Sequence, residues 1–569
     1  MRNKTAAGLT MVFIILIFIF TGCSSTKEAD KQQKKDDAKA ITGSLKDVSA
    51  DENAADNGDA ADKNTADNGD EAITQEQQSS KLLEEKLMTY FKDVKLTDSL
   101  KSYGYKNPLM TQRLGADPYA IVYNDRVYIY MTGDVVEYDS DGKAINNSYS
   151  KINTLNVISS SDLVNWTDHG AIIAAGQNGA ATWGNNSWAP AAAYKVIDGK
   201  DKFFIYFANG GNGIGVLTSD SPTGPFTDPL GHALVSRSTP NCANVAWLFD
   251  PAVLVDDDGK AYLYFGGGIP DNKFADPGTG RVVELGEDMI SLAGDPVSLK
   301  VPYLFEDSGI NKIGDTYYYS YCSNWNVDAK DAQTLGFSNA EIVYMTSKNP
   351  MGPFTLQGSI LKNPGSFFGC YGNNHHCMFN FHDQMYIAYH TQILEKRLGV
   401  SGGYRCTHID PVTINTDGTI VRITASEFGV KQVESLNPYQ RTEAETIGTM
   451  GGVSTALSEA NGENSGTGNM AVTDINTGDW IAVYGADFGD EGANTFTASV
   501  KPSKDQTGAI QIRLDKPTGI VIGYLDIEPS ETEAYKEITT ELFSAVTGKH
   551  DLVFIYYGEG YSIDYWYFK

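Results

Sequence analysis

Cysteine is scarce in this chain. Six cysteines occur among 569 residues: Cys23 follows an N-terminal apolar segment, and the others are Cys242, Cys322, Cys370, Cys377 and Cys406. An odd, widely spaced set is not a disulfide framework, and without a C-x-x-C pair no zinc site is expected. The sequence leaves open whether one disulfide forms.

Basic residues are outnumbered by acidic ones. Lys and Arg total 44 against 72 Asp and Glu, which gives a net charge of −28. Proteins bind the phosphates of nucleic acids through clusters of Lys and Arg. The charge balance therefore argues against a nucleic-acid partner.

Long apolar runs are absent except for Met11–Phe20, which follows Arg2 and Lys4. This run is too short for a membrane span and is typical of a secretory signal. Its ending, FTGC, resembles a bacterial lipobox, which implies cleavage before Cys23 and lipid attachment to its thiol. We predict a signal peptide over 1–23 and an extracellular, cell-surface bacterial lipoprotein that meets the membrane only through its lipid. An uncleaved anchor and a plain signal peptide are the alternatives.

Large apolar side chains are nearly missing from residue 24 to about residue 80, where ADNGD occurs at 55–59 and again at 66–70. Such a composition cannot bury a core. We predict an acidic, disordered tether over 24–97, with a short amphipathic helix over 81–94. A tether between a lipid and a globular body suits an enzyme that works outside the cell on large material.

In place of helical patterns, the body repeats one β-hairpin motif. In LFDPAVLVDDDGKAYLYFGGG an acidic residue opens an apolar strand, Asp258-Gly259 supplies the turn, and an aromatic strand returns. The five copies start about 55 to 75 residues apart, which indicates a repeat architecture. They are Ala116–Thr132, Trp188–Gly210, Leu248–Gly268, Glu306–Asn324 and His375–Thr391.

A second phrase recurs between the hairpins, at Ser159–Trp166, Ser219–Thr227 and Ser347–Thr355. It is typical of the outer strands and turns of the same unit. We therefore predict an all-β chain with a five-bladed propeller over 98–437, built of four-stranded blades around a channel. A β-sandwich also has many short strands, but it does not account for the repeat.

The inner strand of each blade lines the channel, so the residues that open these strands converge at one mouth. They are Asp117, Trp188, Asp250, Glu306 and His375. A single Asp before Pro is ordinarily a turn or strand cap. Three acids at corresponding blade positions instead predict a carboxylate cluster on the axis.

A carboxylate cluster with nearby aromatic residues suits acetal hydrolysis. One acid must be protonated to donate to the leaving oxygen, another must be ionised to activate water, and a third can raise the pKa of the donor. Metal ligation is the competing chemistry. The sequence lacks closely spaced acids such as D-x-D-x-D, which weakens that alternative.

The phrases GADPYAIVYNDRVYIYMT, NSWAPAAAYK, LFDPAVLVDDDG, FEDSG and GNNHH resemble glycoside hydrolase family 43 over 107–438. The resemblance is closest to its arabinofuranosidases that act on arabinoxylan and carry a C-terminal family 6 carbohydrate-binding module. It implies a five-bladed propeller and an inverting mechanism. It assigns Asp117 as general base, Glu306 as general acid and Asp250 as the modulator of the pKa of Glu306.

The same resemblance implies a set of substrate contacts. Trp188 and Phe249 would form the wall of the sugar pocket, with ordinary channel packing as the alternative. Arg405, in GGYRCTHID, would contact the sugar or brace an acid, and a plain salt bridge is the alternative. The remaining candidates are Asn373 or Asn374 as sugar hydrogen-bond partners, His375 as a channel residue and candidate calcium ligand, and Tyr371 and Trp325 in loops near the mouth.

Residues 438–569 change to short alternating strands, which predict a β-sandwich module. The phrases RTEAET, GDWIAVYGADFG and IDYWYFK resemble a family 6 carbohydrate-binding module, which implies a structural calcium at Glu443, Glu445 and Asp564. Ser562 stands where xylan-binding members have Asn, so the module either binds sugar or braces the propeller. Tyr484, Tyr561 and Trp566 are the aromatic candidates for sugar binding, with core packing as the alternative for Trp566.

The leading hypothesis is a monomeric hydrolase that releases α-L-arabinofuranosyl groups from arabinoxylan or a related plant cell-wall polysaccharide. A β-xylosidase or an arabinanase would share the same acids. A noncatalytic polysaccharide binder and a calcium-dependent adhesion protein are alternatives of other classes.

Overall fold

The computed structural model describes residues 75–462, 465–532 and 534–569. The predicted signal peptide, the lipid site at Cys23 and residues 24–74 of the tether lie outside this range. None of the helices described there has the length and apolar character of a membrane span.

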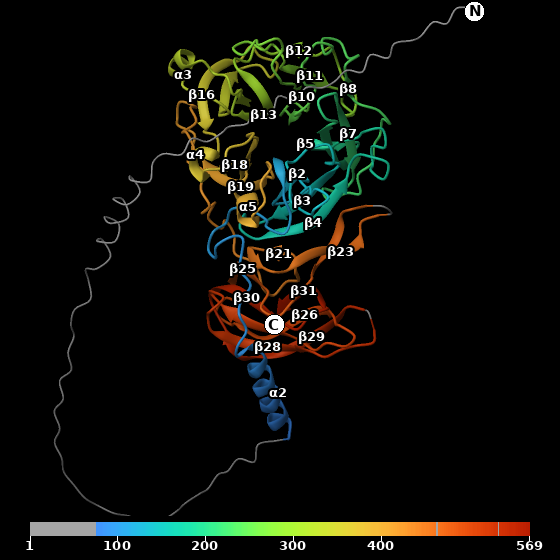
Figure 1. Cartoon of the computed structure of the whole chain (residues 1–569), viewed down its shortest axis with the longest axis vertical. Helices are drawn as coiled ribbons and strands as arrows, with labels where there is room; N and C mark the ends of the chain where they lie inside the picture. The colour runs from blue at the N-terminus through green and yellow to red at the C-terminus, as the bar shows by residue number, and fades with distance from the viewer. Residues whose placement is uncertain (1–74, 463–464, 533) are drawn as a thin grey trace, which may run out of the picture. The chain divides into compact units, whose positions relative to one another are not determined.

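Five antiparallel sheets follow one another along the chain (Figure 1). Blade I contains β1 (Ala116–Tyr123), β2 (Arg126–Thr132), β3 (Thr154–Ser160) and β4 (Trp166–Ile173). Blade II contains β5 (Trp188–Ile197), β6 (Lys200–Ala208), β7 (Gly213–Ser219) and β8 (Val235–Ser236). Blade III contains β9 (Ala252–Val255), β10 (Ala261–Phe265), β11 (Arg281–Leu285) and β12 (Val297–Ser298). Blade IV contains β13 (Leu304–Ile313), β14 (Thr316–Ser323), β15 (Ile342–Ser347) and β16 (Thr355–Leu361), and blade V contains β17 (His376–Phe381), β18 (Gln384–Thr391) and β19 (Cys406–Val412).

The first strands of the blades form a closed ring. Strand β1 contacts β5, β5 contacts β9, β9 contacts β13, β13 contacts β17, and β17 contacts β1 again. The predicted five-bladed propeller is therefore confirmed, and each predicted hairpin is the inner strand pair of one blade. Blade V differs from the predicted four strands: after β19 the chain turns to blade IV, where the N–H of Ile423 donates to the carbonyl of Ile360.

The aromatic second strands join neighbouring blades. The hydroxyls of Tyr130, Tyr206 and Tyr264 donate to the carbonyls of Pro222, Met289 and Pro350, each in the loop before the outermost strand of the next blade. A buried tyrosine needs such a partner for its hydroxyl. Two of these loops contain the second recurring phrase, so that phrase connects the blades as well as shaping each one.

Three short helices of the described residues lie in loops of the propeller. They are α3 (Ala329–Leu335), α4 (Gly365–Phe368) and α5 (Ile393–Leu398). Each ends at a glycine in the left-handed conformation, which favours residues without a Cβ atom.

The C-terminal module is a sandwich of two antiparallel sheets. One has the order β23-β24-β31-β26-β29, with β20 paired to β31, and the other has the order β22-β25-β30-β27-β28. Their bounds are β20 (Thr442–Glu443), β22 (Thr449–Gly451), β23 (Ser454–Ala460), β24 (Gly468–Thr473), β25 (Trp480–Asp487), β26 (Ala493–Lys501), β27 (Gly508–Leu514), β28 (Val521–Ile527), β29 (Lys536–Val546), β30 (Lys549–Tyr557) and β31 (Ser562–Phe568). The predicted sandwich is confirmed.

The propeller and the C-terminal sandwich share a sheet. Strand β21 (Thr446–Ile447) extends blade I by pairing with β4. The side chain of Asn165 donates to the carbonyl of Tyr484 and accepts from its N–H, at 2.8 and 2.7 Å. The module is thus hydrogen-bonded to the propeller.

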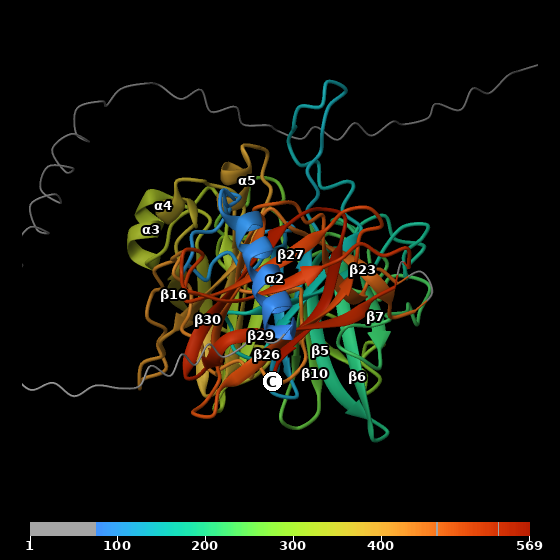
Figure 2. The same ribbon diagram turned by 90° about the horizontal axis from the view of Figure 1, so that it is seen from below.

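Residues 75–97, predicted as the end of the tether, belong to the ordered body. Helix α2 (Gln75–Phe91) begins before the predicted helix and contacts β28 (Figures 1 and 2). Leu87 and Phe91 are one helical turn apart and are buried against Trp480 and Tyr524. The polar composition of this segment did not predict a packed helix, because a short helix needs only a few apolar residues on one face.

Candidate active site

The strand openings meet in the channel, but in a different register from the one that the sequence suggested. Asp117, Ala189, Asp250 and Asp307 occupy the same place in blades I to IV, each with a left-handed backbone, at φ of 47°, 41°, 48° and 68°. Asp307 is therefore the counterpart of Asp117 and Asp250, and Glu306 precedes it by one residue. A bulge between Glu306 and Gly309 allows these neighbouring acids to reach the same cluster.

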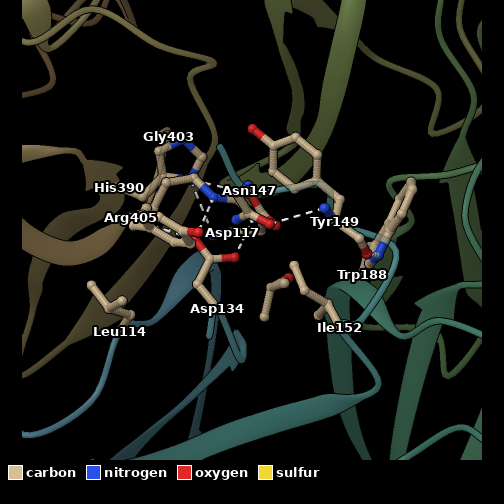
Figure 3. A network of polar contacts seen from close by, with 12 residues as sticks. Leu114, Asp117, Asp134, Asn147, Tyr149, Ile152, Trp188, His390, Gly403 and Arg405 are labelled. Carbon is tan, nitrogen blue, oxygen red and sulfur yellow. Dashed lines mark hydrogen bonds and ion pairs between the residues drawn. The ribbon is translucent and has the colours of Figure 1, made fainter. Parts of the chain in front are cut away.

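Asp117 is buried and bound by Arg405 (Figure 3). Nη1 of Arg405 donates to Asp117 Oδ1 at 2.8 Å, while Nε and Nη2 donate to Asp134 at 2.9 and 2.8 Å. The ring of Tyr149 lies 5.2 Å from the guanidinium carbon. Of the predicted roles for Arg405, the geometry supports bracing an acid.

Two histidines also face Asp117. His390 Nδ1 lies 3.1 Å from the N–H nitrogen and 3.1 Å from Oδ1 of Asp117, and its Nε2 lies 2.9 Å from the carbonyl oxygen of Asn373. His375 Nδ1 lies 3.5 Å from Asp117 Oδ1 and 3.7 Å from Asp250 Oδ2. The predicted base thus sits among cationic and imidazole groups.

The pKa of Asp117 is lowered. Burial by itself would raise the pKa of this carboxyl, but the positive charge of Arg405, together with His375 and His390, outweighs it. Asp117 is therefore ionised at neutral pH, as a group that accepts a proton from water must be.

The pKa of Glu306 is shifted in the opposite direction. Burial raises the pKa of this carboxyl well above its usual range, and the charges of Asp250 and Asp117 raise it further. Its Oε1 is buried without a hydrogen-bond partner in the protein. A protonated carboxyl with an unused oxygen is suited to donating a proton to a bound substrate.

Asp250 interacts electrostatically with both of these acids. Its Oδ2 accepts a hydrogen bond of 3.0 Å from the N–H of Asp307. Burial and the charge of Asp117 raise the pKa of Asp250 well above its usual range. Ionisation of either Asp250 or Glu306 therefore disfavours ionisation of the other, because both carboxyls lie in one buried site.

Asp307 is a member of the cluster that sequence reasoning missed. Its carboxylate lies 3.1 Å from His375 Nε2 and 2.6 Å from His376 Nδ1, and His376 Nε2 contacts Ser320 Oγ at 2.7 Å. The sequence did contain a signal for Asp307, because this residue aligns with the aspartates of the D-P pairs. We assigned that position to the preceding Glu306 instead. Asp134 was missed too, because it lies in a loop outside every repeat.

Aromatic pairs lie at two of the strand openings. The indole N–H of Trp188 donates to the carbonyl of Tyr149 at 2.9 Å, and the two rings meet edge to face. Trp247 packs edge to face against Phe249, with ring centroids 5.2 Å apart, and its own side chain is 37% exposed. Tyr149 and Trp247 were not predicted, and both belong to irregular loops.

The predicted amide and loop residues differ in accessibility. Asn374 is fully buried, and its side chain donates to the carbonyl of Ala340 at 3.1 Å. Asn373 is half-buried, whereas Tyr371 and Trp325 are exposed. Asn373 is therefore the better placed of the two amides for contact with a sugar.

The aromatic residues proposed for sugar binding by the module are buried. Trp566 and Tyr561 are in the core of the sandwich, and Tyr484 packs beneath the ammonium group of Lys106. The core alternative for Trp566 is thus the observed one, and it applies to Tyr561 as well. None of the three rings offers a free face to a polysaccharide.

The predicted calcium ligands of the module lie near one another. Glu445 is buried, with Oε2 lacking a hydrogen-bond partner, and burial followed by the charges of Glu443 and Asp564 raises its pKa well above the usual range. Glu443 pairs with Arg441 at 2.8 Å, and Asp564 accepts from Asn469 at 2.6 Å. Within the described parts of the chain, no set of three or more His, Cys, Asp or Glu side chains is arranged to hold a metal.

His375 does not fit a calcium ligand in this arrangement. Both of its ring nitrogens already face carboxylates, Nε2 towards Asp307 and Nδ1 towards Asp117 and Asp250. Calcium also prefers oxygen ligands. The structure instead joins His375 to the acid cluster.

The fold and the site define a class of protein. A propeller whose inner strands place an ionised and a protonated carboxyl in one aromatic-lined site has the groups that an acid–base hydrolase of glycosidic bonds requires. The family model for glycosyl hydrolases family 43 matches residues 105–420, and that for carbohydrate-binding module family 6 matches residues 443–569.

Individual proteins are similar over most of the chain. An arabinoxylan arabinofuranohydrolase of Paenibacillus polymyxa is 49% identical over 481 residues, 82% of this chain and 74% of that protein. One of Bacillus subtilis is 48% identical over 490 residues, 83% of this chain and 94% of that protein. A crystal structure of a family 43 arabinoxylan arabinofuranohydrolase from Bacillus subtilis in complex with cellotetraose superposes with a TM-score of 0.78, at 48% identity, covering 83% of this chain and 99% of the other. The chain belongs to glycoside hydrolase family 43 and carries a C-terminal family 6 module.

Proposed function

We propose that this protein is an inverting glycoside hydrolase that releases α-L-arabinofuranosyl side groups from arabinoxylan. The observation that carries the proposal is one buried cluster in which Asp117 is bound by Arg405 at 2.8 Å while Oε1 of Glu306 has no protein partner. The directions of the pKa shifts, lowered at Asp117 and raised at Glu306, agree with this geometry. The similarity to arabinoxylan arabinofuranohydrolases over more than four-fifths of the chain supports this substrate.

The proposed reaction occurs in a single displacement. Glu306 gives its proton to the glycosidic oxygen as the bond from that oxygen to C1 breaks. A water molecule forms the new bond to C1 from the opposite face and loses a proton to Asp117, so the anomer inverts. Exchange with solvent then returns the proton to Glu306 and removes it from Asp117.

The remaining groups of the cluster assist these two carboxyls. Asp250 keeps Glu306 protonated through like-charge repulsion, and Arg405 keeps Asp117 ionised. Trp188 and Phe249 form the walls that receive the sugar, and Asn373 is placed to hydrogen-bond it.

Product analysis by NMR on wheat arabinoxylan tests the proposal, because it reports the released sugar and its first anomer together. We expect arabinose, released with inversion. A panel of nitrophenyl arabinofuranoside, nitrophenyl xyloside and linear arabinan separates the related activities. Release of xylose without arabinose, or of the retained anomer, would overturn the proposal.

We further propose that the module holds a structural calcium through Glu443, Glu445 and Asp564. The buried, unpartnered carboxyl oxygen of Glu445 beside two other acids supports this, because such a group is costly unless protonated or paired with a cation. Oxygen ligands are those that calcium prefers. The metal would bind these carboxylates together and so stabilise the part of the sandwich where β20 pairs with β31.

We also propose that the protein is a monomeric lipoprotein secreted to the cell surface and attached through Cys23. The lipobox-like ending of the apolar run supports this proposal. Labelling with a radioactive fatty acid tests it: the wild-type protein should carry label and Cys23→Ala should not. Equal labelling of both would exclude Cys23 as the site.

A further inference from the structure

Asp134 is the second residue after β2, outside every repeated motif, and its side chain is fully buried. Arg405, 271 positions away in the chain, donates three hydrogen bonds to the carboxylate of Asp134. They come from its backbone N–H at 3.0 Å, from Nε at 2.9 Å and from Nη2 at 2.8 Å (Figure 3). A carboxylate that accepts both from the fork of a guanidinium and from the backbone of the same residue fixes that side chain in one orientation.

This orientation points the remaining arm of Arg405 at Asp117. Nη1 lies 2.8 Å from Asp117 Oδ1, and the ring of Tyr149 covers the guanidinium. Of the three side-chain hydrogen bonds that position Arg405, two are made by Asp134. The contact with Asp117 therefore depends on a residue that does not itself reach the site.

The surroundings of Asp134 make this dependence strong. Gly133 packs so closely on Thr154 that a Cβ atom would lie 2.5 Å from Thr154 Oγ1, which fixes the backbone on one side of Asp134. Asp134 and Leu114 also line a pocket of about 510 Å³. Arg405 does not line this pocket, so its orientation depends on its hydrogen bonds to Asp134 and Asp117 and on the ring of Tyr149.

Arg405 also balances the negative charges of two carboxylates. One guanidinium charge is shared between the carboxylates of Asp117 and Asp134, at 2.8 Å from each. Without Asp134, the guanidinium would lose the two side-chain bonds that set its orientation and keep only its bond to Asp117. Nη1 would then no longer be held in one position relative to the base.

We propose that Asp134 is a positioning residue: it holds Arg405 so that Nη1 keeps the base Asp117 in its working geometry. This role rests on the proposed function, in which Asp117 activates water. Asp134 acts through Arg405 and touches neither the sugar nor the water.

The test compares Asp134→Asn with a matched control, Asp168→Asn. Asp168 is also a fully buried aspartate of blade I, paired with Arg113 and with the hydroxyl of Thr455 at 2.7 Å, but it lies in strand β4 away from the acid cluster. The kcat, the KM for nitrophenyl arabinofuranoside and the melting temperature are measured for the wild type and both variants.

We expect Asp134→Asn to lower kcat about 100-fold with little change in KM, because a misplaced catalytic group costs this much. Asp168→Asn should lower the melting temperature but leave kcat unchanged. If Asp134→Asn keeps the wild-type kcat, or if both variants lose kcat equally, Asp134 has no positioning role. If the wild-type protein releases no arabinose, the proposed function fails instead.

A double-mutant cycle with Arg405→Lys shows whether Asp134 acts through Arg405. We expect the double variant to be no slower than the worse single variant, because the two substitutions remove the same contact. Additive losses would overturn the proposal. If Asp134→Asn does not fold, Asp134→Glu, which keeps the charge, enters the same cycle and should show the same non-additivity.

Discussion

The N–H of Asp307 donates a 3.0 Å hydrogen bond to Oδ2 of Asp250, which joins blades III and IV directly beside Glu306. This bond fixes the position of Asp250 relative to the proposed proton donor. Asp250 is thereby held as a neighbouring charge, while Glu306 keeps an oxygen without a protein partner.

Replacing the proton donor should affect substrates according to their leaving groups. Glu306→Gln should lower kcat on arabinoxylan about 10²- to 10⁴-fold, because the leaving sugar oxygen needs a proton. A dinitrophenyl arabinofuranoside, whose leaving group is stable as an anion, should lose much less activity. Steady-state kinetics on both substrates check this, and equal losses on the two would remove Glu306 from the role of acid.

The pH profile should depend on Asp250. Activity requires protonated Glu306, so the basic limb of kcat/KM reports the coupled titration of Glu306 and Asp250. Burial is the larger cause of the raised pKa of Glu306, and the charge of Asp250 is the next. Asp250→Asn removes that charge, so the pKa of Glu306 should fall and the basic limb should move to lower pH.

The shift is measured from kcat/KM on nitrophenyl arabinofuranoside across the pH range. Asparagine keeps the oxygen that accepts from the Asp307 N–H, so the variant tests charge with little change in geometry. Asp315→Asn, an exposed aspartate paired with Lys348 on blade IV, is the control and should leave the profile unchanged. A basic limb that stays in place in Asp250→Asn would contradict the proposed role.

Removing calcium should destabilise the C-terminal module. A chelator should lower its melting temperature, and excess calcium should restore it, because the metal binds only the folded arrangement of carboxylates. Glu445→Gln should remove this response, whereas Glu459→Gln, an exposed residue of the same module, should retain it. Calorimetry with and without chelator checks this, and a wild-type protein that does not respond would exclude the site.

Helix α2 should contribute to the stability of the module. Leu87→Ala should cost about 2 kcal/mol, because it removes buried apolar contacts against the sandwich. Leu82→Ala on the same helix is the control, since Leu82 is 62% exposed and should change the stability by less than about 0.5 kcal/mol. Urea unfolding followed by tryptophan fluorescence compares the two, and equal effects would mean that α2 does not contribute through this contact.

Much of the fold could be predicted because its determinants are local. Each hairpin shows alternation within one strand pair and a short turn, as at Asn124-Asp125, where both residues have the left-handed backbone that such turns require. The inner strands therefore could be located from the sequence, and with them Asp117, Asp250 and Glu306. The helix at 75–91 was only partly predicted, because its apolar face is meaningful only where Trp480 and Tyr524 are placed against it.

The sequence by itself determined the repeated hairpins, the number of blades and the acids at their openings, because alternation, turns and repeats are properties of neighbouring residues. Only the tertiary structure decided which of those residues meet. Closing the ring brings Asp134 to Arg405 across 271 positions and places Asp307 in the register that Glu306 had been expected to hold. In the C-terminal module, the packing of its two sheets buries Tyr561 and Trp566, since a strand pattern shows that two faces exist but not which face another sheet will cover.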